Sequence, residues 1–303
     1  MAKYDIVILT DQKHAYPNKV DHLIKNVITE DALLVNALGK LGLKVIRLAW
    51  SDPDFDWAST KAIVFRTTWD YCNDFPKFSD WLNKVSKVTT LINSEALIRW
   101  NIDKHYLQDL QNKGVHITET LFIAPHTTKR LEELHTQMGW TETVLKPCVS
   151  GGARHTYRLN ANNIASYEAV FKALIAEEAM MLQPFQHHIV SEGEISMMVF
   201  NGEFTHAILK KAKAGDFRVQ DDFGGSVEDY TPTNAQIEFA INTVNACSEL
   251  PIYARVDIFK DNEGNIALAE LEIIEPELWL RHHPDSAMVL AKGIKDKLLR
   301  IPN

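Results

Sequence analysis

The chain has 303 residues, of which 46% are hydrophobic and 24% are charged. This balance is typical of a globular protein and excludes a disordered, collagen-like or coiled-coil chain. With 32 Lys and Arg against 40 Asp and Glu, the formal net charge is −8, so nucleic acid is not an expected partner. The 3 cysteines form no C-x-x-C pair, and no apolar run approaches the ~18 residues of a membrane span. We therefore expect a cytoplasmic protein without a membrane partner.

Strand and helix patterns alternate through the first predicted domain, residues 1–95. Short apolar runs at 5–9, 43–48 and 62–65 predict strands that are covered on both faces, and a helix precedes Gly42. Alternation of this kind predicts a parallel α/β sheet, whose ligands bind beyond the carboxyl ends of the strands. Arg66 and Asp70 follow the third strand, and we expect them to contact a carboxylate and an ammonium group of the substrate. The alternative for Asp70 is a simple turn residue.

The pattern changes near residue 96. The second predicted domain, residues 96–185, begins with a helix that ends at Gly114 and continues with short units at 143–146, 155–158, 164–176 and 180–183. The third predicted domain, residues 186–303, begins with a hairpin around Asn201-Gly202, the strongest two-residue turn signal. A helix over 234–250, a second hairpin over 253–274 and a terminal helix near 299 follow. These patterns predict an α/β domain followed by an α+β unit.

The second hairpin carries an unusual charge pattern. Strand alternation places Arg255 and Asp257 on one face, and Glu270 and Glu272 on the same face of the returning strand. A turn centred between residues 263 and 264 sets Asp257 opposite Glu270 and Arg255 opposite Glu272. The apolar side chains then share the other face, against a core. This core face consists of Ala254, Val256, Ile258, Ala269, Leu271 and Ile273.

Carboxylates that face one another destabilise a sheet and do not all ionise without a cation. Mg²⁺ binds oxygen ligands, usually carboxylates together with substrate phosphates. The hairpin therefore predicts a Mg²⁺ site at Asp257, Glu270 and Glu272. The alternative is a solvated face on which flexible side chains spread the charges.

Two lysines can supply the positive partners of a phosphate. Lys146 ends an apolar strand just before Ser150-Gly151-Gly152, and Lys104 stands at the start of a helix. Glycines let backbone N–H groups approach phosphate oxygens, and a lysine adds a point charge. The alternatives are an ordinary surface turn for the glycine loop and a solvated helix position for Lys104.

In this order, the elements resemble the ATP-grasp superfamily of carboxylate–amine ligases over nearly the whole chain. The resemblance implies an ATP-grasp fold with an N-terminal Rossmann-like (pre-ATP-grasp) domain. The segments 66–71 and 275–276 are similar to those of D-cycloserine synthetases and glutathione-synthetase-like enzymes. The motifs that carry the resemblance are Asn101-Ile102-Asp103-Lys104, Val144-Leu145-Lys146-Pro147, Ser150-Gly151-Gly152, Gln183-Pro184-Phe185, Glu192-Gly193-Glu194, Asp216-Phe217-Arg218, Arg255-Val256-Asp257 and Glu270-Leu271-Glu272.

The resemblance also implies roles in nucleotide binding. Lys104 and Lys146 would hold the phosphates of ATP, and Ser150, Gly151 and Gly152 would form a mobile loop over them. Gln183, Pro184 and Phe185 would be the hinge that reads adenine through its backbone, while Glu194 would bind the ribose.

Three catalytic roles follow from the same resemblance or from the strand pattern. Arg255 is similar to the arginine that precedes the metal aspartate in D-alanine–D-alanine ligases. Arg218 is similar to an arginine of the substrate loop in glutathione synthetase and ribosomal-protein glutamate ligases. Strand alternation lets only one of Lys210 and Lys211 face the cleft, and we favour Lys211.

The resemblance implies an ADP-forming ligase that converts a small amino-acid-like substrate to an acyl phosphate and then joins it to an amine. Its cofactors would be ATP and two Mg²⁺ ions, with Mn²⁺ as an alternative, and a homodimer is an expectation from the family. Two other functions stay open: a cyclising synthetase or kinase with the same MgATP site, and a nucleotide-binding protein without catalysis. Glu272, where many members have Asn, and Glu275-Pro276-Glu277, where Pro-Gly is common, leave the substrate undefined.

Overall fold

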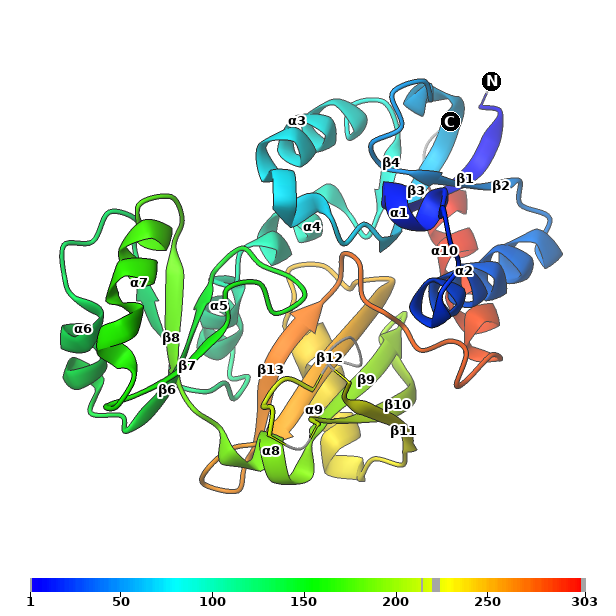
Figure 1. The fold of residues 1–303 in the computed structure, drawn as a ribbon. Coiled ribbons are helices and arrows are strands. Elements are labelled where there is room, and N and C mark those ends of the chain that lie inside the picture. Colours follow the sequence, from blue (N-terminus) through cyan, green and yellow to red (C-terminus); the bar gives the residue numbers. More distant parts are fainter. Residues whose placement is uncertain (1, 214, 220–223, 301–303) are drawn as a thin grey trace.

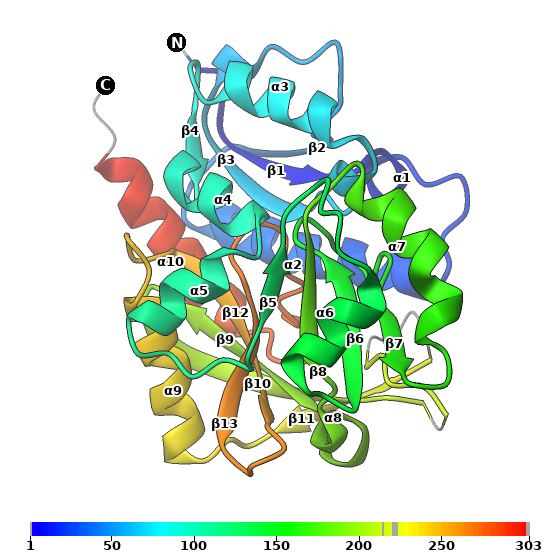
Figure 2. The ribbon, with the colours of Figure 1, turned by 90° about the vertical axis from the view of Figure 1, so that its left-hand side faces the viewer.

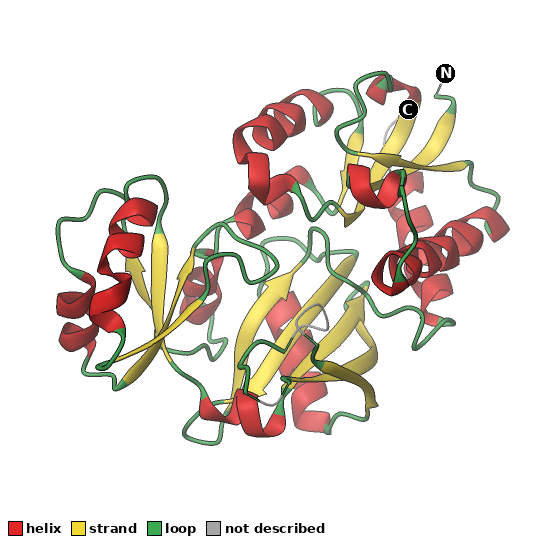
Figure 3. Cartoon of the chain, viewed as in Figure 1, coloured by secondary structure: helices red, strands yellow, loops and turns green. Residues whose placement is uncertain are grey.

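The computed structural model describes residues 2–213, 215–219 and 224–300. These residues form three sheets with helices packed around them (Figure 1), and Figure 3 separates the helices and strands by colour. Within the described ranges, no helix has both the length and the apolar character needed to cross a bilayer.

The first sheet consists of parallel strands in the order β2-β1-β3-β4, as the alternation of strands and helices predicts. Helices α2 and α10 cover one face, and α3 and α4 cover the other. Helix α2 ends at the predicted place, where Gly42 has a φ of +82°. The bounds are β1 (Tyr4–Thr10), α1 (Gln12–Ala15), α2 (His22–Lys40), β2 (Val45–Ala49), β3 (Thr60–Thr67), α3 (Phe75–Val85), β4 (Thr90–Ile92), α4 (Glu95–Ile102) and α10 (Ser286–Leu299).

The predicted helix that ends at Gly114 is two helices, α4 and α5 (Tyr106–Asn112). The chain leaves the helical path at Asp103, whose side chain accepts a hydrogen bond of 3.0 Å from the backbone N–H of His105. Side-chain bonding of this kind competes with a continuous helix. The prediction of one helix is therefore wrong, and Lys104 lies in the break just before α5.

The second sheet is antiparallel in the order β5-β8-β6-β7, and α6 and α7 pack on it. The strand predicted at 155–158 begins later, because Ala153 and His155 have positive φ angles of 56° and 51°. Strand β5 and helix α6 are absent from the predicted elements. The bounds are β5 (Leu121–Ile123), α6 (Leu131–Met138), β6 (Glu142–Pro147), β7 (Tyr157–Asn160), α7 (Glu168–Ile175) and β8 (Met180–Pro184).

The third sheet is antiparallel in the order β11-β10-β9-β12-β13, and both predicted hairpins are present. Helix α9 packs on its core face and is shorter than the predicted 234–250. Strand β11 is a further element that the sequence pattern did not predict. The bounds are α8 (His187–Glu192), β9 (Glu194–Phe200), β10 (Glu203–Lys211), β11 (Ser226–Tyr230), α9 (Asn234–Asn245), β12 (Tyr253–Lys260) and β13 (Ile266–Glu272).

The first and third sheets are joined by buried side chains. Asn93 donates to the carbonyl oxygens of Tyr253 at 2.9 Å and Ile273 at 2.8 Å, and accepts from the N–H of Ile252 at 2.6 Å. Helix α10, at the end of the chain, packs back against α2 of the first sheet, as Figure 2 also shows. Each sheet lies within one of the ranges 1–95, 96–185 and 186–303, whereas the exact boundaries stay a prediction.

Candidate active site

A cavity of about 410 Å³ lies among the described residues where the three sheets meet. Its wall includes Tyr71 from the segment that follows β3 of the first sheet, Lys146 from the second sheet and Asp257 from the third. Most of the residues to which the sequence analysis assigned a site role lie on this wall. They are Lys104, Lys146, Ser150, Gly151, Gly152, Gln183, Pro184, Phe185, Glu194, Arg218, Arg255, Asp257, Glu270 and Glu272.

The carboxylate hairpin has the predicted register at the cavity. Asp257 pairs with Glu270 and Arg255 pairs with Glu272. The predicted turn centre is wrong, however, because Lys260 pairs with Ile266. A one-residue bulge at Ala269 restores the predicted pairing, since the register shifts between Asp257 and Ile258.

The bulge also changes one member of the core face. Ile258 pairs with Leu268, which is 2% exposed, so Leu268 takes the core position predicted for Ala269. Ala269 is left unpaired and lines the cavity, as Leu268 also does. The carboxylates and the apolar side chains are thus on opposite faces, as the alternation predicts, although the strand is not regular.

Arg255 and Lys210 neutralise part of the negative charge on the hairpin. Arg255 lies 2.8 Å from Asp257 and forms a second ion pair with Glu272, while Ser196 donates to Asp257 at 2.6 Å. Burial raises the pKa of Asp257, but Arg255 and Lys210 outweigh it and lower this pKa to about 2. Burial, reinforced by the neighbouring carboxylates, raises the pKa of Glu272 to about 8 despite Arg255. The hairpin therefore holds more carboxylate than its own cations neutralise.

The two predicted phosphate lysines differ in their partners. Lys104 lies 2.9 Å from Glu270 and donates to the carbonyl oxygen of Ser150 at 2.6 Å. Burial opposes its charge, but the charge of Glu270 raises its pKa. Lys146 forms no ion pair and donates no side-chain hydrogen bond to any described residue. Burial and the charge of Lys104 lower the pKa of Lys146, as expected for a cation that awaits an anionic ligand.

The glycine loop is tied to both sides of the cavity. The carbonyl oxygen of Ser150 accepts the hydrogen bond from Lys104, and the hydroxyl of Ser150 donates to the carbonyl of Arg154 at 3.1 Å. Gly152 has a φ of +57°, which favours glycine. Arg154 donates to the carbonyl of Val149 at 3.0 Å and pairs with Glu178, so the base of the loop is held to the second sheet.

The expectation for Lys211 is wrong. Lys211 is exposed and pairs with Glu228. Lys210 is 4% exposed, lines the cavity, and lies 2.6 Å from Glu194 and 3.2 Å from Asp257. The rule that only one of the two lysines faces the cleft is confirmed, but the lysine is Lys210.

A second bulge explains this reversal. In a regular hairpin turning at Asn201-Gly202, Glu194 would pair with residue 209, and Lys211 would share its face. The register shifts between Phe204 and His206, so Glu194 pairs with Lys210 instead. Gly193 allows this approach: it has a φ of +91°, and a Cβ atom there would clash with the carbonyl oxygen of Lys210.

The predicted adenine hinge is partly occupied by protein hydrogen bonds. The N–H of Phe185 donates to the carbonyl of Glu142 at 2.9 Å, and its own carbonyl accepts from Asn262 at 2.9 Å. Among the described residues, only the side chain of Gln186 donates a hydrogen bond to the carbonyl of Pro184, at 3.1 Å. Gln186 also lines the cavity, although the sequence analysis did not select it.

Arg218 lies on the cavity wall together with Phe217, as the resemblance implies. Its guanidinium lies 2.7 Å from Asp216. This hydrogen-bonded pair keeps the pKa of Asp216 well below its usual range. The segment 220–223, which follows it, lies outside the described residues.

Arg66 and Asp70 do not lie on the cavity wall, so the structure does not support direct substrate contact by either. Arg66 is 3% exposed and donates to the carbonyl of Pro276 at 2.8 Å. Asp70 accepts a hydrogen bond of 2.6 Å from the indole of Trp50. Both side chains are bonded inside the protein, although their neighbours Trp69 and Tyr71 line the cavity.

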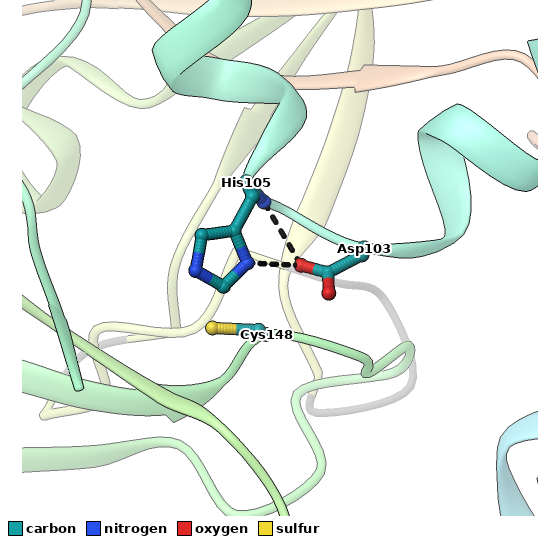
Figure 4. A group of neighbouring side chains, drawn as sticks. All are labelled: Asp103, His105 and Cys148. Atoms are coloured by element: carbon teal, nitrogen blue, oxygen red, sulfur yellow. Dashed lines mark hydrogen bonds and ion pairs between the residues drawn. The ribbon is translucent and has the colours of Figure 1, made fainter. Parts of the chain in front are cut away.

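Figure 4 shows a further group of polar side chains beside Lys104, formed by Asp103, His105 and Cys148. The ring nitrogen of His105 lies 2.6 Å from Asp103, a hydrogen-bond distance, and the ring stacks on Phe122. Burial and the charge of Asp103 raise the pKa of the Cys148 thiol to about 12. Asp103 and His105 are therefore bonded to each other at the break between α4 and α5.

These features define a class of protein. Two antiparallel sheets enclose two lysines, a glycine loop and a carboxylate hairpin, and this is an ATP-grasp arrangement. Residues 107–273 match the RimK-like ATP-grasp domain family, and residues 6–93 match the N-terminal domain of D-cycloserine synthetase DcsG. The first match spans more than half of the chain. The chain therefore belongs to the RimK-like ATP-grasp domain family.

Individual relatives agree with this assignment. The cycloserine biosynthesis protein DcsG of Streptomyces lavendulae is 28% identical over 282 residues, which cover 88% of this chain and 92% of that protein. The crystal structure of D-cycloserine synthetase DcsG is similar with a TM-score of 0.84 and 26% identity, over 97% of this chain and 99% of that one. The D-alanine–D-alanine ligase of Bacillus anthracis, complexed with ATP, shares the fold with a TM-score of 0.65 and 14% identity, over 98% of each chain.

The predicted superfamily and fold are thus confirmed. The protein is an enzyme of the ATP-grasp ligase class, which uses ATP to form a C–N bond between a carboxylate and an amine. This finding sets aside the alternative of a nucleotide-binding protein without catalysis.

Proposed function

We propose that the enzyme is an ADP-forming ligase that activates the carboxylate of a small amino-acid-like substrate as an acyl phosphate. The observation that carries this proposal is the presence of Lys104, Lys146 and the carboxylate hairpin on the wall of one cavity. Phosphoryl transfer requires mainly positioning and charge neutralisation from a protein, and these groups can provide both.

Lys104 and Lys146 hold the phosphates in this proposal. Lys146 has no anionic partner among the described residues, and Lys104 already bonds to the glycine loop through Ser150. The Pro184 carbonyl and the backbone N–H of Gln186 are the hinge groups best suited to read adenine, since the backbone of Phe185 is already bonded. Glu194 lies on the same wall and would contact the ribose.

Asp257, Glu270 and Glu272 fit a hard divalent cation. All three offer carboxylate oxygens on one face of the hairpin. Burial, together with the charges of Glu270 and Asp257, raises the pKa of Glu272 to about 8. We propose that they hold two Mg²⁺ ions, with Mn²⁺ as a substitute. The ions supply charge neutralisation for the phosphates when bound.

In the first step, a substrate carboxylate oxygen attacks the γ-phosphorus of ATP, and ADP leaves. In the second, an amine nitrogen attacks the carbonyl carbon, phosphate leaves, and the nitrogen loses a proton. Arg255 lies beside the hairpin carboxylates and Arg218 on the same wall, where they can offset charge on the acyl phosphate and the oxyanion. The 150–152 loop and the Arg218 loop would exclude water from the acyl phosphate.

A cyclising synthetase is the second candidate. The match of residues 6–93 to the N-terminal domain of D-cycloserine synthetase favours it, because that domain supplies one side of the cavity. In this case the attacking nitrogen belongs to the same molecule as the activated carboxylate. The nucleotide and metal residues would keep the roles given above.

The test is the release of ADP and phosphate with Mg²⁺ or Mn²⁺ across a panel of amino acids and small amines, followed by mass spectrometry of the products. A ligase gives a product with the mass of acid plus amine minus water, a cyclising synthetase gives a product from one substrate, and a kinase releases ADP without phosphate. Lys146→Ala and Glu270→Ala should abolish release, whereas Lys172→Ala and Glu263→Ala, at exposed sites, should not. Release that survives the first two substitutions would contradict the proposed site.

A further inference from the structure

Glu275 lies three residues beyond β13, on the part of the cavity wall that the first domain completes. Trp69, Tyr71 and Cys72 from the first domain line the cavity there, and Glu277 lies nearby on the same segment. Glu275 is half-buried.

The other carboxylates of the wall already have cationic partners. Each of these other carboxylates has an Arg or Lys nitrogen within ion-pair distance. Glu275 forms no ion pair with any residue that the structure describes. The paired carboxylates are Glu194, Asp257, Glu270, Glu272 and Glu277. A half-buried carboxylate without a cation in a ligand cavity is a binding group that lacks its partner.

The first domain fixes the backbone at Glu275 and at the residue that follows it. The indole of Trp69 donates to the carbonyl of Glu275 at 2.9 Å, and Arg66 donates to the carbonyl of Pro276 at 2.8 Å. Such a group is preorganised, so a ligand need not order it on binding. This also gives Arg66 a function: it positions the wall instead of contacting the substrate.

The surroundings of Glu275 favour a cation. Burial raises its pKa to about 7, even though Tyr71 lowers it through a hydrogen bond, so a positive ligand would restore its full charge. Trp69, which is 40% exposed, adds an aromatic surface, on which cations are also stabilised. The charge of Lys104 lowers the same pKa, but that lysine is already bonded to Glu270 and Ser150.

We propose that Glu275 determines substrate specificity by binding the ammonium group of a small amino acid, beside Tyr71 and Trp69. This inference rests on the proposed function and defines its substrate class. It replaces the expected contact with Asp70, whose side chain is bonded to Trp50. The substrate is accordingly a zwitterion, and the matching acid without an amine binds poorly.

The experiment compares Glu275→Gln with the wild type and with Glu263→Gln, an exposed turn residue, as the matched control. Calorimetry with a non-hydrolysable ATP analogue and Mg²⁺ measures the affinity for D- and L-alanine, D- and L-serine, and the amine-free acids propionate and 3-hydroxypropionate. ADP release gives kcat and KM for the same compounds.

The expected result is that wild type and Glu263→Gln prefer at least one amino acid over its amine-free acid by tenfold or more. Glu275→Gln should lose this preference through a higher KM for the amino acid, while its affinity for the ATP analogue stays unchanged. A wild type that binds none of the amino acids in preference to the acids, or a Glu275→Gln variant that keeps the preference, would overturn the inference. Failure to bind the ATP analogue at all would instead overturn the proposed function.

Discussion

The ammonium group of Lys210 lies 3.2 Å from a carboxylate oxygen of Asp257 and bridges it to Glu194 at 2.6 Å. It thereby joins the residue expected at the ribose to the residue expected at the metal. Lys210 and Asp257 are buried in the cavity wall, and the side chain of Glu194 is 14% exposed. The bridge exists because the bulge in β10 turns Lys210, instead of Lys211, toward the cavity.

Lys210→Met should therefore be far more damaging than Lys211→Met. Loss of the Lys210 charge leaves Glu194 without a cation and Asp257 with Arg255 alone. Removal of one partner from a buried pair costs about 3–5 kcal/mol. The exposed pair of Lys211 with Glu228 contributes about 1 kcal/mol or less. Urea unfolding and ADP release measure both effects, and equal losses in the two variants would contradict the assigned face.

Lys146→Ala should separate nucleotide binding from stability. We expect the Kd for ATP to rise at least tenfold, because a positive charge near the phosphates is lost. The free energy of unfolding should stay unchanged or increase, since burial and Lys104 already disfavour this charge and lower its pKa. Calorimetry and urea unfolding test the two parts, with Lys172→Ala as the control on an exposed helix position. A large loss of stability would show that Lys146 has a structural partner.

Asn93→Ala should destabilise the contact between the first and third sheets. The side chain satisfies two carbonyl groups and one N–H group, and each buried group left unpaired costs about 1–3 kcal/mol. We expect a loss of about 3 kcal/mol or more in the free energy of unfolding, whereas Asn112→Ala, at an exposed helix end, should change it by about 0.5 kcal/mol or less. Chemical denaturation at one pH decides between these outcomes.

The buried His206 should make stability depend on pH below neutrality. Burial lowers its pKa from 6.5 to about 4, and the ring stacks on His283 with centroids 5.1 Å apart. Between these two pH values the unfolded chain binds a proton that the folded chain does not, so stability falls as the pH is lowered through this window. His206 thereby contributes about 3 kcal/mol to the free energy of unfolding, and this contribution is fully present only above about pH 6.5.

The measurement is the free energy of unfolding at pH 7 and pH 4.5 for wild type and His206→Gln, whose amide can still donate to the carbonyl of Leu278. Carboxylates titrate in both proteins, so the difference between the two slopes isolates the histidine. Parallel slopes would mean that the pKa of His206 is the same in the folded and unfolded protein, which contradicts the prediction.

The alternation of side chains explains which site residues could be predicted. It placed Asp257 and Glu270 on one face correctly, because hydrophobic partners on the opposite face define the phase of both strands. It failed for Lys211, because a bulge at Thr205 leaves no mark in the hydrophobic pattern. Bulges depend on how neighbouring strands twist and pack, which a single strand does not reveal.

Contacts between distant segments account for the other differences. Arg66 follows a strand, where ligand contacts are common, yet it is occupied by the carbonyl of Pro276 from the far end of the chain. Glu275 could have been found only by asking which carboxylates lack a cation in three dimensions. The family motifs mark the residues that we propose to bind ATP, whereas the packing of the first domain decides which of its side chains face the cavity.

The bulge at Ala269 makes this strand unusually tolerant of a change in length. Losing one residue from a β-strand normally turns every later side chain to the opposite face. Here Ala269 is the unpaired residue between Leu268 and Glu270, so its deletion would give a regular ladder with Asp257 still opposite Glu270. A shorter chain could therefore keep the same carboxylate geometry, and relatives of different strand length need not differ in metal chemistry.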